Sequence, residues 1–106
     1  MNRQQQIDSF VAQAHQLAMQ RLREHPERVR EVRAQLTRWR DVAGQTRSDA
    51  YWDEWERLLG GSAEALATAI CADTDHATVL RSMSPMSVLI TQAERAHLLR
   101  QARQAA

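Results

Sequence analysis

The chain has 106 residues, a formal net charge of +1 and 43% hydrophobic residues. This length allows one domain with a modest core, residues 1–106, and excludes a large multilayer enzyme. The near-neutral charge does not favour bulk binding to a phosphate backbone, and the single cysteine, Cys71, excludes an intramolecular disulfide. No apolar run approaches the roughly 18 residues of a membrane span and no signal peptide is visible, so we expect a cytoplasmic protein with no membrane partner.

Local propensity favours helix almost throughout, because Ala, Leu, Gln, Glu and Arg dominate the composition. From about residue 4 to residue 24, apolar residues recur at the three- and four-residue spacing of one helical stripe. Pro26 ends this first helix, since proline disfavours helical backbone in the residue before it. A second helix is expected from Pro26 to Ala43, with Gly44 as its stop. Its apolar stripe is Val29, Val32, Leu36, Trp39 and Ala43, and we expect the first four inside the protein.

Shorter helices are expected in the second half of the chain. A third helix is expected to be capped by Ser48 and to end at Gly60-Gly61, and a fourth should run from Ser62 to about Ala72. A fifth is expected from about His76 to Met83, with its cap within Asp73 to Asp75. An apolar connector from Met86 to Ile90 then leads to a last helix from Gln92 to about Gln104. Thr91 and Glu94 match a capping box at the start of this last helix. The predicted fold is all-α: a single compact bundle of two longer N-terminal helices, two or three short central helices and a C-terminal helix.

Charge is unevenly distributed along the chain. Residues 21–47 hold eight Arg and four acidic residues, residues 48–80 hold one Arg and seven acidic residues, and residues 81–106 hold four Arg and one acidic residue. Two interpretations stay open. The acidic middle folds back on the basic flanks and the charges neutralise each other, or one charged face stays open and selects a partner by complementarity.

The candidates for chemistry are few. Cys71, Asp73, Asp75 and His76 could in principle hold a metal, but a structural zinc site needs four ligands at paired spacing. The pairs Asp73/His76 and Glu94/His97 have the spacing of helical di-metal sites, yet no further inward carboxylates accompany them. No nucleophile lies in a glycine-rich elbow, and His15, beside the first stripe, is expected at the surface or a boundary. We therefore expect no metal, no cofactor and no enzymatic activity.

The aromatic residues suggest both a core and an interface. The spacing of Trp39, Trp52 and Trp55 predicts that they are buried against one another, while a Tyr51/Trp55 edge is an interface candidate because Tyr and Trp dominate binding hot spots. The apolar faces of the chain also exceed what one small bundle comfortably encloses, which predicts a homodimer or a protein partner. The candidate partner-binding residues are Phe10, Tyr51, Trp55, Met83, Pro85 and Met86.

Nucleic-acid binding is the competing interpretation. The arginines of the second helix are spread around it rather than gathered on one face. The nearest candidate for a helix-turn-helix, residues 76–83 and 92–104, is interrupted by eight residues that include Pro85, where a tight turn is needed.

The segments REHPERV, YWDEWERLL and LRSMSPMSVLITQAERAHLLRQAR, within residues 20–103, resemble a group of small bacterial helical proteins of toxin-antitoxin-type operons. In that group a D-E-W-E helix precedes an S-P-x-x-x-x-L-T-x-x-E-R segment. The matching residues are Asp53, Glu54, Trp55 and Glu56, then Ser84, Pro85, Leu89 or Ile90, Thr91, Glu94 and Arg95, with Met86 where relatives have a bulky aromatic. The resemblance implies an antitoxin-like or regulatory partner of another protein, such as a toxin. The alternatives are a small DNA- or RNA-binding regulator and a self-associating helical protein.

Overall fold

The computed structural model describes residues 2–104, and every regular element within them is helical. The elements are α1 (Arg3–Glu24), η1 (Pro26–Arg28), α2 (Val29–Ala43), α3 (Asp49–Leu59), α4 (Ala63–Ile70), α5 (Asp75–Ser82), η2 (Pro85–Leu89) and α6 (Gln92–Gln104), where η marks a short 3-10 helix. The all-α prediction is confirmed. None of the described helices is long and apolar enough to cross a membrane.

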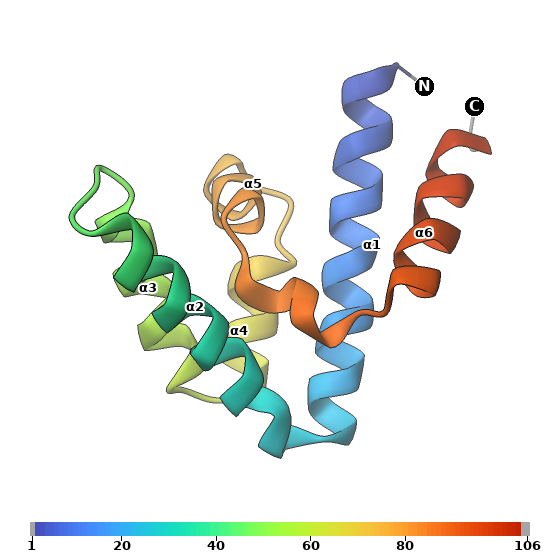
Figure 1. Ribbon diagram of the computed structural model, residues 1–106. Helices are drawn as coiled ribbons and strands as arrows, with labels where there is room; N and C mark the ends of the chain where they lie inside the picture. The colour runs from blue at the N-terminus through green and yellow to red at the C-terminus, as the bar shows by residue number, and fades with distance from the viewer. Residues whose placement is uncertain (1, 105–106) are drawn as a thin grey trace.

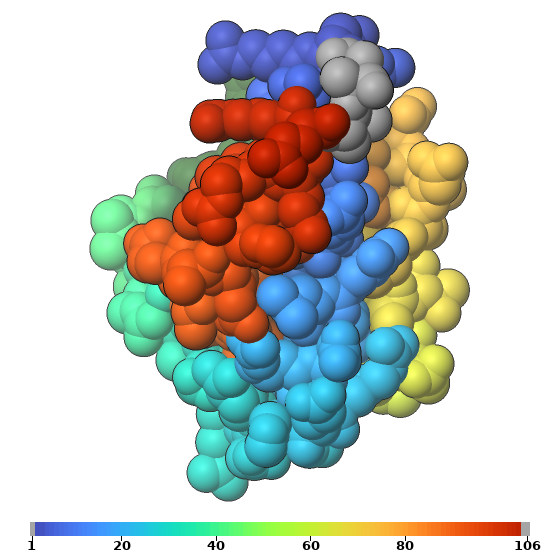
Figure 2. Space-filling model, turned by 90° about the vertical axis from the view of Figure 1, so that its right-hand side faces the viewer, coloured from blue at the N-terminus to red at the C-terminus, as the bar shows by residue number. Residues whose placement is uncertain are grey.

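The helices form two arms that meet around the short segment η2 (Figure 1). On one side α6 runs antiparallel to α1, and on the other side α2 packs against α3. The helices α4 and α5 connect the arms, and η2 contacts both α1 and α2. Figure 2 shows α6 and the segment leading into it covering part of α1.

Apolar residues from both arms share one core. The most deeply buried side chains are Met19 of α1, Val32 and Leu36 of α2, Trp55 of α3, Leu66 and Ile70 of α4, Leu80 of α5, and Pro85, Met86 and Leu89 of η2. The predicted apolar connector is therefore the centre of the molecule rather than its edge. Of the second helix's stripe, Val29 and Trp39 are only half-buried, because the ends of α2 extend past the core.

Few large apolar side chains are fully exposed in the described part of the chain. Among the described residues the exposed large hydrophobic side chains are Ile7, Val42 and Val79. The apolar area still open to solvent lies at these positions and at half-buried side chains such as Trp39 and Trp52. The expectation of a dimer or partner therefore stays a prediction.

Local signals set the helix ends. The Ser62 hydroxyl accepts from the amide of Ala65, as predicted, and Gly44 has the positive φ of 65° that favours glycine. Two expectations need correction. Thr74, not a neighbouring Asp, caps α5 with its side chain, and Ser48 makes no side-chain cap bond to α3.

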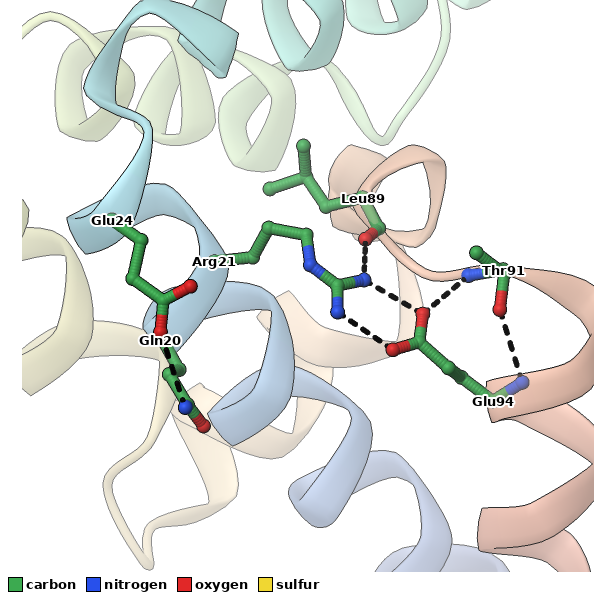
Figure 3. A network of polar contacts seen from close by, with 6 residues as sticks. All are labelled: Gln20, Arg21, Glu24, Leu89, Thr91 and Glu94. Carbon is green, nitrogen blue, oxygen red and sulfur yellow. Dashed lines mark hydrogen bonds and ion pairs between the residues drawn. The ribbon is translucent and has the colours of Figure 1, made fainter.

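A polar clamp fastens α6 to α1 (Figure 3). The Thr91 hydroxyl accepts from the Glu94 amide, and the Glu94 carboxylate accepts from the Thr91 amide, which completes the predicted capping box. The same carboxylate binds the Arg21 guanidinium in a two-pronged ion pair with both N–O distances at 2.6 Å. Arg21 also donates to the carbonyl of Leu89 at 2.8 Å. Arg21 and Glu94 together thus join the last turn of α1 to the end of η2 and the start of α6.

This clamp predicts a pH-dependent contribution to stability. The hydrogen bonds from Arg21, with help from Thr91, lower the pKa of Glu94 from 4.5 to about 2. A depressed carboxyl pKa gives stabilisation that is complete above the unfolded-state value and is lost as pH falls from 4.5 to about 2. We expect Glu94→Gln to lower the melting temperature at pH 7. The difference from wild type should shrink steadily as pH falls below 4.5, measured by circular dichroism. A difference of constant size across this range would contradict the ion-pair assignment.

Candidate functional site

The six predicted partner-binding residues do not form one surface. Trp55, Pro85 and Met86 are in the core, and Phe10 is also buried. Tyr51 and Met83 are half-buried. The expected Tyr51/Trp55 edge is wrong, because Trp55 turns inward and its Nε1 donates to the carbonyl of Leu80 at 3.0 Å.

The exposed aromatic surface lies instead on the outer part of the α2–α3 pair. Trp39 and Trp52 are both half-buried, and their rings meet edge to face with centroids 5.8 Å apart. Val42, one helical turn after Trp39, is 90% exposed. We call Trp39, Val42 and Trp52 the aromatic patch. The prediction that the three tryptophans are buried against one another is corrected, because only Trp55 is in the core.

One charge beside this patch, that of Arg40, is paired. Arg40, which follows Trp39, lies 2.8 Å from Asp53 and 3.1 Å from Glu56 of α3. The hydrogen bond that Arg40 donates to Asp53 is the main cause that raises the pKa of Arg40. A basic residue of α2 is therefore neutralised by acidic residues of α3. Arg23 pairs similarly with Glu64 of α4 at 3.4 Å, so part of the charge segregation is neutralised within the fold.

A second polar contact joins α3 to α5. The Nε2 atom of His76 lies 2.9 and 2.8 Å from the two carboxylate oxygens of Glu54, and the ring of Tyr51 lies 6.0 Å from the His76 ring. Tyr51 therefore packs beside this polar contact. Its half-buried position belongs to the packing of α5 on α3 rather than to an open edge with Trp55.

The residues considered for chemistry are placed apart or already engaged. No group of three His, Cys, Asp or Glu side chains within the described chain could hold a metal ion. His76 is paired with Glu54, and Glu94 is occupied by the clamp with Arg21. Cys71 is an exposed free thiol, and desolvation raises its pKa, which disfavours the nucleophilic thiolate.

One titratable residue differs from expectation. His15 is buried rather than at a boundary, with 7% of its surface exposed. Its spacing in the sequence placed His15 beside the apolar stripe of α1, but the sequence of α1 alone does not show that other elements cover this residue.

The sequence gives only a weak indication of the aromatic patch, namely that Trp39 and Val42 share one face of α2.

Comparison of the chain with protein-family models, with curated proteins and with solved structures finds no match in any of the three.

Proposed function

We propose that the protein is a non-enzymatic, cytoplasmic binding protein whose aromatic patch contacts another protein, in an antitoxin-like or regulatory role. The observation that carries this proposal is the exposure of Val42 one helical turn from the half-buried Trp39, whose ring meets that of Trp52. Tryptophan is among the residues most enriched in binding hot spots, which favours a partner that desolvates the patch. The resemblance of residues 53–56 and 84–95 to operon-encoded helical proteins supports a protein partner.

The charges around the patch favour a protein over a nucleic acid. A phosphate backbone is bound by cationic side chains free to replace its counterions. Arg40 is instead held by Asp53 and Glu56, so this guanidinium beside the patch is already neutralised. A DNA- or RNA-binding regulator is therefore the alternative, and self-association through the same patch is the third.

A photo-reactive amino acid at position 42, introduced in the native host, tests the proposal. We expect a covalent adduct with a different protein, and no such adduct from the same probe at position 79. Val79 is a matched control because it is also exposed and lies on α5, outside the patch. A cross-link to a second copy or to nucleic acid would contradict the proposal, as would equal capture at both positions.

The captured protein then allows a measurement of affinity. Val42→Glu should weaken binding by roughly thirtyfold if Val42 lies at the centre of the contact, because a charge is buried there against apolar surface. Val79→Glu should leave the affinity unchanged. Both variants should keep the wild-type helical spectrum, since both side chains are at the surface.

A further inference from the structure

A pocket of about 530 Å³ lies where α1, the end of α5, η2 and the start of α6 meet. Its apolar wall is formed by Phe10, Val11, Ala14, Met86 and Ile90. It shares no residue with the aromatic patch. Its volume is in the range of small-molecule sites, which are typically about 300–1,000 Å³.

The pocket is lined by a buried histidine with one unused nitrogen. The Nδ1 atom of His15 lies 2.8 Å from the carbonyl oxygen of Val11. Its Nε2 is buried and has no hydrogen-bond partner among residues 2–104. Desolvation lowers the pKa of His15, so the ring is neutral at pH 7. The Nδ1–H donates to Val11, which leaves the Nε2 lone pair as an acceptor. Buried polar groups are nearly always paired, so this acceptor calls for a donor.

Two arginines also line the pocket, and no acidic residue does. Arg81 is held by the carbonyls of Ile70 and Ala72, at 2.7 and 2.9 Å. The guanidinium of Arg95 lies over the ring of Phe10, 5.1 Å from its centroid. Neither arginine has a carboxylate partner within the described part of the chain. The pocket therefore combines cationic side chains with an apolar wall.

Hydroxyl groups add donors to this cationic side. The oxygen of Ser84 accepts from the amide of Met86, and the oxygen of Thr91 accepts from the amide of Glu94. Each hydroxyl hydrogen remains available to a further acceptor. Both residues line the pocket. These groups suit a ligand with an anionic, acceptor-rich end.

We propose that this pocket binds a small amphipathic organic carboxylate that also carries a hydroxyl group. The carboxylate faces Arg95 and the nearby hydroxyls, the apolar body packs on Val11, Ala14 and Ile90, and the hydroxyl donates to Nε2 of His15. This site is independent of the proposed protein-binding patch, and either can fail without the other.

The test uses NMR titration of the wild-type protein with four probes. Three have matched shape: 4-hydroxybenzoate, benzoate and 4-hydroxybenzyl alcohol. The fourth, 3-hydroxyoctanoate, is an aliphatic hydroxy acid. We expect the two hydroxy acids to shift the ring signals of His15 and Phe10. Benzoate, which lacks the donor, and the neutral alcohol, which lacks the charge, should each bind roughly tenfold more weakly.

Two variants on α6 distinguish binding in the pocket from nonspecific attraction of an anion to the positive charge of this helix. Arg95→Gln should weaken binding of the hydroxy acids by roughly tenfold or more, since it removes a charged hydrogen-bond donor. Arg100→Gln is the matched control, because Arg100 is exposed on the same helix and does not line the pocket. The proposal is wrong if neither hydroxy acid shifts His15 or Phe10 at about 10 mM. It is equally wrong if the alcohol binds as well as the acids. Because these readings come from wild-type protein, they hold even where a variant does not fold.

Discussion

Replacing Trp55 with Ala is expected to lower the free energy of unfolding by about 3–5 kcal/mol. The indole is fully buried among residues of the shared core, and its Nε1 donates to the Leu80 carbonyl. The change therefore leaves a large cavity and removes a hydrogen bond between α3 and α5. Since a domain of this kind is stable by about 5–15 kcal/mol in total, a large part of its stability is lost.

Trp52→Ala is the matched control for this change. Trp52 is on the same helix and has the same side chain, but it is only half-buried. Its replacement should cost clearly less than that of Trp55. Urea unfolding followed by circular dichroism measures both changes, because the remaining tryptophans complicate fluorescence. Equal losses would contradict the assignment of Trp55, and not Trp52, to the buried core.

The order of the helices could be predicted from the sequence because local chemistry sets their ends. The capping box of Thr91 and Glu94, the Ser62 cap and Gly44 each act within four residues. Pro26 correctly predicted the end of α1. The second helix was expected to begin at this proline, but a short 3-10 segment, η1, comes first and α2 begins at Val29. Capping interactions between residues so close in the sequence depend little on the rest of the fold.

Which tryptophan is buried could not be predicted in the same way. Trp52 and Trp55 lie on one face of α3, so periodicity treats them alike. The difference arises from α5, since the partner of Trp55 is the carbonyl of Leu80, 25 positions away. Periodicity shows that a face is covered, but not where along that face the covering helix crosses.

The pocket was hidden for the same reason. Its walls come from residues 10–15, 81–87 and 90–95, which meet only after α6 has folded back on α1. In the sequence of α1, His15 is simply a polar residue beside an apolar stripe. Its unpaired Nε2 becomes evident only when the surrounding helices bury it.

Changing Met86 to Glu is expected to destabilise the protein by about 3–5 kcal/mol at pH 7, because an unpaired charge would enter the core. Met86 is 1% exposed and belongs to η2, which lies between α1 and α2. The sequence alone placed Met86 among the candidate partner-binding residues, where this change would weaken an interface and leave the fold intact. The buried position predicts loss of helical structure instead, which light scattering and circular dichroism on the same sample distinguish.

The effect of this substitution should depend on pH. Burial raises the pKa of the introduced carboxyl in the folded state, so the penalty is complete above that raised value. It shrinks as pH falls toward the ordinary glutamate value of about 4.3, where the unfolded chain is protonated as well. Met86→Leu is the control at each pH, since it keeps the volume and should cost less than about 1.5 kcal/mol. A folded, fully helical Met86→Glu variant at pH 7 would show that η2 does not occupy the core.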